Sequence, residues 1–323
     1  MARLPRRRAP LRRHPTASPS LMVLGDLLLD VVARADAGLR PGSDVQGTVR
    51  FRVGGSAANV ARAFSRLGGT ATLISSIGRD GWGSRLVDAV RAEGVTVRPI
   101  KGAGESGRLL ALVGVDGERT FVTERGATDG IRAADLRPSW FRGVGALHVP
   151  AYGLILDEPY AAARRAVELL RDGAAARRVL VSVDLASYGP LRDLGVAAAK
   201  RRVASLGPDL LFANHREAAT LTGRRAHFTP LLDLAPVVVV KEGAGGCQVL
   251  WRNGSETVRL EVATAPVTAP DTTGAGDAFA AGFLRTLIGT DSPMGEAVLR
   301  RAALAGHRSA GDLLRRPRST LAV

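Results

Sequence analysis

The stretch APDTTGAGDAFAAGF, residues 269–283, joins a run of small residues to an aspartate at the start of a predicted helix. We expect Thr272 and Thr273 to cap this helix. Its first turn exposes the backbone N–H groups of Gly274, Ala275 and Gly276. Such a terminus binds an anion without a cationic side chain. Asp277 can face an approaching hydroxyl group, so the stretch provides an anion hole beside a general base, as phosphorylation of an alcohol requires. A glycine-rich helix start with a solvated aspartate is the alternative.

Two other phosphate-binding patterns are excluded by the sequence. GAGESG at 102–107 fits the G-x-G-x-x-G pattern of dinucleotide sites, but the strand RLLALVGV follows it where that pattern requires a helix. We therefore interpret it as a turn. The G-x-x-x-x-G-K-[ST] pattern is absent from the chain, which excludes a P-loop kinase.

Alternating apolar strands and helices must position the 269–283 stretch. LMVLGD predicts a buried strand that delivers Asp26 at its C-terminal end, and GGSAANVARAFSRLGG predicts a helix with Ser56 as its N-cap. Further buried strands are predicted at TATLISSIG, VTVRPI, ALHVPA, VLVSVDL, DLLFAN and VVVVKEG. Strands that alternate with helices predict a parallel sheet with crossover helices.

Two segments interrupt this alternation. Residues 33–53 are polar and patchily alternating, and residues 105–125 contain two strands around Asp116-Gly117, a hairpin signal. We expect both to form a small sheet, a β lid, outside the main one. The main domain then consists of residues 21–32, 54–104 and 126–323.

The composition fits an α/β protein. The chain has 323 residues and a net charge of +15, but six arginines lie within residues 1–20, so nucleic acid is an unlikely partner. That segment lacks an apolar core like that of a secretory signal, and we expect a disordered basic tail. No apolar run is long enough to span a membrane, and the lone Cys247 fits the reducing cytoplasm.

Three motifs in order resemble those of the ribokinase-like, or PfkB, carbohydrate kinase family. DTTGAGDAF looks like its C-terminal signature, GGSAANVARAFSRLG is similar to its N-terminal glycine-rich motif, and ANHREAATLTG matches its Asn-x-x-Glu element. The resemblance covers roughly residues 21–310. It implies a three-layer α/β/α fold with a mostly parallel central sheet and a small β lid, and an ATP-dependent kinase acting on a hydroxyl group of a small sugar.

On the acceptor side, the resemblance implies that Asp277 is the base and that the turn from Gly274 to Gly276 is the anion hole. Asp26 matches an aspartate that grips sugar hydroxyls; a helix or turn cap is the alternative. The substrate-facing glycine-rich motif maps onto Gly54, Gly55 and Asn59.

On the nucleotide side, Asn214 and Glu217 resemble the pair that organises Mg²⁺ and phosphates, with Glu217 acting on the metal through water; an exposed helix-start pair is the alternative. Further ATP-site candidates are Lys241, Gly243, Gly246 and His307. Lys241 departs from the family's commoner Thr. Asp271 and Thr273 lie where some members hold a monovalent cation, K⁺ in our expectation.

The leading hypothesis is thus a sugar kinase whose partners are a small sugar and ATP, with a possible homodimer through the lid. A nucleoside kinase of the same family would need lid aromatics to stack a base, and the lid offers only Phe51 and Phe121. A catalytically silent sugar sensor is the other alternative, although a sensor has no need of Asp277.

Overall fold

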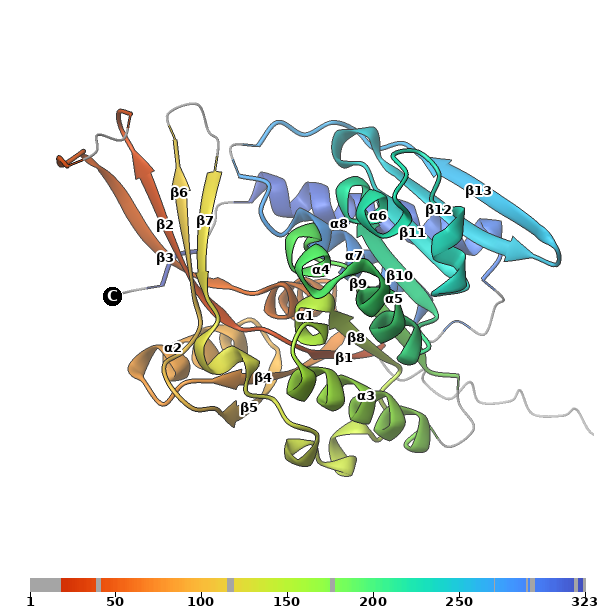
Figure 1. The fold of residues 1–323 in the computed structure, drawn as a ribbon, viewed down its shortest axis with the longest axis horizontal. Helices are drawn as coiled ribbons and strands as arrows, with labels where there is room; N and C mark the ends of the chain where they lie inside the picture. Colours follow the sequence, from red (N-terminus) through yellow and green to blue (C-terminus); the bar gives the residue numbers. More distant parts are fainter. Residues whose placement is uncertain are drawn as a thin grey trace, which may run out of the picture.

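Two sheets make up the molecule, a large one inside the main body and a small one that stands away from it (Figure 1). The computed structural model describes residues 19–38, 42–114, 119–174, 178–269, 271–288, 290, 294–316 and 319–321. The predicted tail, apart from Pro19 and Ser20, lies outside these residues. Ser20 itself begins the first strand.

The large sheet has nine strands in the order β13-β12-β11-β10-β9-β8-β1-β4-β5. They are β1 Ser20–Leu24, β4 Thr70–Ile77, β5 Thr96–Lys101, β8 Ala146–Pro150, β9 Leu180–Asp184, β10 Leu210–Asn214, β11 Val237–Lys241, β12 Cys247–Asn253 and β13 Glu256–Val262. Only the pairings of β12 with β11 and β13 are antiparallel among these strands. The central strands are continuous apolar runs because helices cover both of their faces.

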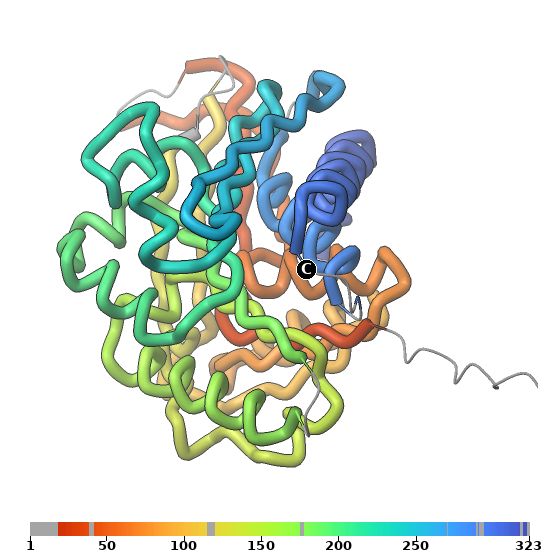
Figure 2. Tube along the Cα trace, turned by 90° about the vertical axis from the view of Figure 1, so that its right-hand side faces the viewer, coloured from red at the N-terminus to blue at the C-terminus, as the bar shows by residue number. Residues whose placement is uncertain are grey.

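The helices form the two outer layers of a three-layer fold. They are α1 Ser56–Arg66, α2 Gly81–Ala92, α3 Asp157–Asp172, α4 Tyr188–Leu194, α5 Val196–Ser205, α6 His215–Thr222, α7 Ala275–Leu287 and α8 Glu296–Arg315. One hydrophobic core packs α1, α2, α7 and α8 on the sheet, and the other packs α3 to α6 on its opposite face (Figure 2). The predicted three-layer fold is confirmed. No helix among the described residues is both long and apolar enough to cross a membrane.

The small sheet has four strands in the order β3-β2-β6-β7. They are β2 Leu28–Ala35, β3 Gly47–Gly54, β6 Arg108–Val113 and β7 Arg119–Glu124. The sheet begins at Leu28, five residues before the start at 33 that the sequence suggested. The predicted turn at Asp116-Gly117 lies outside the described residues.

The register of the small sheet separates its two faces. Asp30 pairs with Arg52, Val32 with Arg50 and Arg34 with Thr48, so these side chains share one face. Val31 and Phe51 pair on the other face, where Phe51 stacks on Trp82 of α2. This packing anchors the end of the sheet that adjoins α1 and α2 to the main body.

Candidate active site

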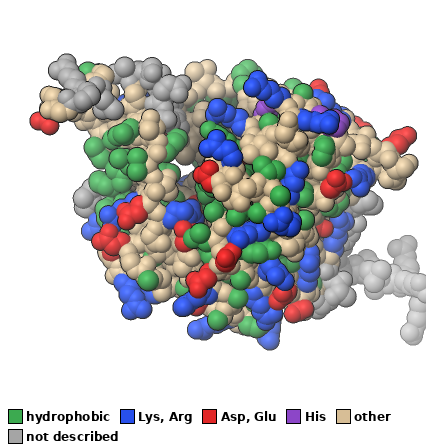
Figure 3. Space-filling view, viewed as in Figure 1, with side chains coloured by type: hydrophobic (Ala, Val, Ile, Leu, Met, Phe, Trp, Pro, Cys, Tyr) green, Lys and Arg blue, Asp and Glu red, His purple; other side chains and the backbone are tan. Residues whose placement is uncertain are grey.

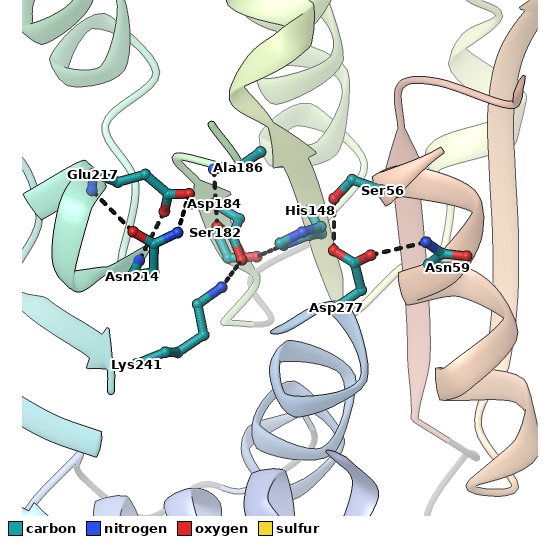
Figure 4. A network of polar contacts seen from close by, with 10 residues as sticks. All are labelled: Ser56, Asn59, His148, Ser182, Asp184, Ala186, Asn214, Glu217, Lys241 and Asp277. Atoms are coloured by element: carbon teal, nitrogen blue, oxygen red, sulfur yellow. Dashed lines mark hydrogen bonds and ion pairs between the residues drawn. The ribbon is translucent and has the colours of Figure 1, made fainter. Parts of the chain in front are cut away.

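Asp277 lies in the first turn of α7 and is held by two donors from α1. Its Oδ1 accepts a 2.7 Å hydrogen bond from Ser56 Oγ, and its Oδ2 accepts one of 2.9 Å from Asn59 Nδ2 (Figure 4). Both donors follow directly after β3 of the small sheet. The predicted role of Ser56 as N-cap is therefore wrong: Gly55 holds that position, and the Ser56 hydroxyl orients the carboxylate.

The environment of Asp277 makes its carboxylate more basic than usual. Burial raises its pKa to about 6, and the negative charge of Asp184 acts in the same direction. The hydrogen bonds from Ser56 and Asn59 and the charge of Lys241 oppose this rise. A carboxylate with this pKa can accept a proton near neutral pH.

The turn before α7 has the shape of an anion site. Gly274 is the N-cap with φ of 77°, a left-handed conformation that a glycine adopts without strain. The predicted N-cap position of Thr272 or Thr273 is wrong, because Gly274 is the N-cap; the Thr272 carbonyl accepts the Ala275 amide at 3.2 Å. The amides that open an α-helix lack intrahelical acceptors, so those of Gly276 and Asp277 remain available.

A mostly buried lysine, Lys241, lies against this turn with 15% of its side chain exposed. A Cβ on Gly276 would come within 3.2 Å of Lys241 Nζ, and Nζ donates a 2.6 Å hydrogen bond to Asp184 Oδ2. Burial lowers the pKa of Lys241, but the carboxylates of Asp184 and Glu217 outweigh it, so the pKa is raised. Lys241 therefore stays charged and places a cation beside the turn before α7.

Asp184 was missed by the sequence reasoning. It ends β9, and its Oδ1 accepts the amide of Ala186 at 3.1 Å, where Ala186 has a positive φ of 58°. Such strain persists only where surrounding structure enforces it, and it concentrates at functional sites. The available signal was an aspartate at the C-terminal end of a buried parallel strand, the same signal that drew attention to Asp26.

Asn214 and Glu217 form a reciprocal pair at the start of α6. Glu217 Oε2 accepts the Asn214 amide at 2.7 Å, and Asn214 Oδ1 accepts the Glu217 amide at 2.9 Å, which is a capping box. Burial and the charge of Asp184 raise the pKa of Glu217. The pair thus caps the helix, but Glu217 is buried and not exposed as the alternative stated, and it lies close enough to Asp184 and Lys241 to share their electrostatics (Figure 4).

The remaining nucleotide-side candidates lie around the end of β13 and the turn after β11. A Cβ on Gly246 would come 2.2 Å from the Val262 carbonyl, the same oxygen that lies 3.0 Å from His307 Nε2. His307 also packs edge-on against Phe279 of α7. Gly243 has a positive φ of 60° and open space where a side chain would be.

Asp26 has a clear structural role. It is buried, and its Oδ1 accepts the Ala57 amide at 3.0 Å while its backbone carbonyl accepts Ala58 at 3.2 Å. A Cβ on Gly55 would come 2.5 Å from that carbonyl. Asp26 therefore holds the N-terminus of α1, as the cap alternative stated, and it is not among the residues that line the large cleft.

Asp30 lies in that cleft instead and was missed by the sequence reasoning. Its Oδ1 is buried without a hydrogen-bond partner among the described residues, and a Cβ on Gly54 would come 1.8 Å from it. Burial, followed by the charge of Asp26, raises its pKa to about 7. The carboxylate in the run LLLDVV was hidden because the apolar letters on both sides suggested a continuous core strand.

The cleft lies between the small sheet and the ends of α1, α7 and α8. It has a volume of about 940 Å³, and Asp30, Asn59 and Gly274 are in its lining. The cleft therefore extends from the small sheet to Gly274, the N-cap of the helix whose first turn contains Asp277.

Asp271 and Thr273 precede this turn. Asp271 Oδ2 accepts a 2.8 Å bond from Arg52 of β3, and its Oδ1 accepts the Thr273 amide at 3.0 Å. The guanidinium of Arg52 thus already neutralises the carboxylate predicted to hold a monovalent cation.

Comparison with known proteins identifies the group to which this arrangement belongs. Residues 18–317 match the pfkB family carbohydrate kinase profile. The chain is 32% identical over 292 residues to the ATP-dependent ribose-1-phosphate kinase of Halopiger xanaduensis, covering 89% of this chain and 90% of the relative.

Solved structures share the fold. The adenosine kinase of Sinorhizobium meliloti superposes with a TM-score of 0.78 at 23% identity, covering 94% of this chain and 98% of that one. A Vibrio cholerae O395 fructokinase with bound fructose, ADP and calcium gives 0.72 at 23% identity, covering 92% and 93%. The chain belongs to the pfkB family of carbohydrate kinases and is a phosphotransferase.

Proposed function

We propose that the protein transfers the terminal phosphoryl group of ATP to a hydroxyl group, primary in our expectation, of a small sugar or sugar derivative. The observation that carries this proposal is Asp277, a partly buried carboxylate fixed by Ser56 and Asn59 beside the glycine turn. Asp277 takes the proton of the attacking hydroxyl, and the turn with Lys241 stabilises charge on the transferring group.

The acceptor is held in the cleft under the small sheet. Asp30 replaces Asp26 in our assignment, because Asp30 lines this cleft, its buried Oδ1 has no hydrogen-bond partner among the described residues, and a carboxylate can accept two adjacent hydroxyls. Gly54 leaves the room that the Asp30 carboxylate occupies, and Asn59 contacts both the base and the cleft.

Asn214 and Glu217 would hold Mg²⁺ through water. The described residues contain no cluster of three or more His, Cys, Asp or Glu side chains suited to a metal. That fits Mg²⁺, which keeps several waters and uses one or two carboxylates with substrate phosphates. When bound, Mg²⁺ neutralises charge on the phosphates of ATP. Gly243, Gly246 and His307 then flank the rest of the nucleotide.

The predicted potassium site already contains a positive charge, the guanidinium of Arg52. Asp271 and Thr273 stay our candidates for a monovalent cation, but Arg52 supplies a positive charge at Asp271 already. We therefore expect turnover to change less than about threefold when K⁺ is replaced by tetramethylammonium. ATP as a substrate also favours the cytoplasm as the place of action.

The proposed function is tested with a panel of sugars, sugar derivatives and nucleosides. ATP consumption is coupled to a spectroscopic assay, and the phosphorylated product is identified by ³¹P NMR. Transfer to at least one sugar hydroxyl is expected. Transfer to nucleosides alone would replace the sugar assignment, and ATP consumption without any phosphorylated acceptor would overturn it.

A further inference from the structure

Arginine is concentrated in the lining of the acceptor cleft. The arginines there are Arg34, Arg50, Arg52, Arg62, Arg66, Arg315 and Arg316, whereas the described carboxylates of the lining are Asp30, Glu93 and Asp271. Clefts lined by one sign of charge attract ligands of the opposite sign. Three of these arginines, Arg34, Arg50 and Arg52, lie on β2 and β3 of the small sheet.

Most of the arginines near the base of the cleft are already paired. Arg62 and Arg66 both bind Glu93, and Arg52 binds Asp271. Arg52 nevertheless has a buried Nε without a hydrogen-bond partner in the described part of the chain. Its donor capacity is therefore only partly used.

Arg34 and Arg50 have no carboxylate within ion-pair distance among the residues that the structure describes. Arg50 lies two residues from Arg52 along β3 and diagonally across from Arg34 on β2, at spacings of about 7 Å between Cα atoms. Like charges at this spacing on one sheet face repel each other, and an anion bound between them would relieve that repulsion.

We propose that the acceptor is a sugar phosphate, a sugar that already carries one phosphate, and that Arg50, Arg52 and Arg34 hold this phosphate at the lid end of the cleft. The free hydroxyl to be phosphorylated then points toward Asp277. This inference rests on the proposed function, since it names the class of acceptor for the same site.

A phosphate monoester fits the three arginines better than a carboxylate does. One guanidinium fork satisfies a carboxylate, whereas a phosphate monoester has three terminal oxygens and close to two negative charges. ATP is not the ligand of these arginines in this assignment. Asp277 lies between Lys241 and Asn214 on the proposed nucleotide side and Asn59 of α1, the helix that β3 of the small sheet leads into (Figure 4).

The test compares matched acceptors that keep a free primary hydroxyl: ribose 1-phosphate with ribose, and fructose 6-phosphate with fructose. Ribonate and gluconate are tested as acceptors that carry a carboxylate instead of a phosphate. For at least one phosphorylated member, kcat/KM should exceed that of its parent sugar by about 100-fold, the scale of two charged hydrogen bonds. A preference for a neutral sugar or for an acid would overturn this inference while leaving the kinase assignment intact. Transfer to no member would count against the proposed function itself.

Variants of Arg50 locate the phosphate. Arg50→Gln should lower kcat/KM for the sugar phosphate by about 10-fold or more, mainly through KM, and so narrow its advantage over the parent sugar. Arg50→Lys keeps the positive charge but lacks the two-pronged guanidinium, so its kcat/KM for the sugar phosphate should lie between those of the wild type and Arg50→Gln.

Arg108→Gln is the matched control, because its register places Arg108 on the opposite face of the sheet. Arg108→Gln should leave kcat/KM unchanged for both the sugar phosphate and its parent sugar. Melting temperatures verify that all variants fold. An unchanged preference in a folded Arg50→Gln would contradict the assignment.

Discussion

Burial of Asp277 sets the pH range in which this residue can act as a base. Its folded pKa of about 6 lies above the ordinary value of 3.8, so the carboxyl group is protonated below about pH 6 and ionised above it. A protonated carboxyl cannot accept the acceptor's proton. Turnover should therefore rise with pH up to about 6 and then level off.

Replacement of Ser56 by Ala tests this arrangement. The hydrogen bond from Ser56 lowers the pKa of Asp277, so its loss should move the acidic limb of the kcat profile to higher pH. Full profiles of both enzymes are measured with saturating substrates. A limb that stays in place while kcat merely falls would show that Ser56 supports the fold and does not tune the base.

Lys241 and Asp184 are expected to behave as a pair. Lys241→Met leaves the almost fully buried Asp184 without its partner, which should destabilise the protein by roughly 3 kcal/mol in urea unfolding and also weaken ATP binding. In the double variant Lys241→Met with Asp184→Asn, stability should recover while ATP affinity stays low. Recovery of both stability and ATP affinity would mean that Lys241 does not bind the phosphates of ATP.

At the scale of elements, the small sheet is the part that we expect to move. It is anchored at its base by Phe51 and Trp82, and its cleft face carries Asp30 and Arg50, the acceptor contacts that we propose. Closure of such a flap would exclude water that could otherwise take the phosphoryl group.

Hydrogen exchange tests this motion. The acceptor alone should protect β2, β3 and β7, whereas ATP alone should protect mainly the regions around Asn214, Gly243 and Gly274. Protection of the three strands by ATP alone, with no response to a phosphorylated acceptor, would show that the sheet closes on the nucleotide.

The central strands of the large sheet could be predicted because they are short apolar runs between helical segments. The helix start at Asp277 was also evident, since its glycines and carboxylate are adjacent in sequence. Asp30 and Asp184 were not found, because their importance depends on burial and on partners from distant elements. Ser56 and Asp26 make other contacts than expected for the same reason: Ser56 donates to Asp277, and Asp26 accepts an amide at the start of α1.

At the scale of the whole molecule, the small sheet exposes apolar side chains to solvent. Figure 3 shows them gathered over that part of the surface. On the face away from the cleft, Val49 and Val122 are each 60% exposed. Contiguous exposed apolar residues of this kind mark association surfaces. We therefore keep a homodimer through the lid as a prediction.

Sedimentation equilibrium of the wild type should give twice the chain mass of 33.8 kDa. Val122→Glu should shift the protein toward the monomer, because it places a negative charge from each copy in the proposed dimer interface. Leu156→Glu, at a 49% exposed position just before α3 in the main body, is the control and should not change the mass. A monomeric wild type would contradict the prediction.

Asp277→Asn tests the central claim most directly, since it removes the base while keeping the shape of the side chain. Asp312→Asn, at an exposed carboxylate of α8, serves as the control. We predict that Asp277→Asn lowers kcat by about 100-fold or more, with melting temperature and ATP affinity nearly unchanged and the control at wild-type turnover. A folded Asp277→Asn that keeps more than about a third of wild-type kcat would contradict the assignment of Asp277 as the general base.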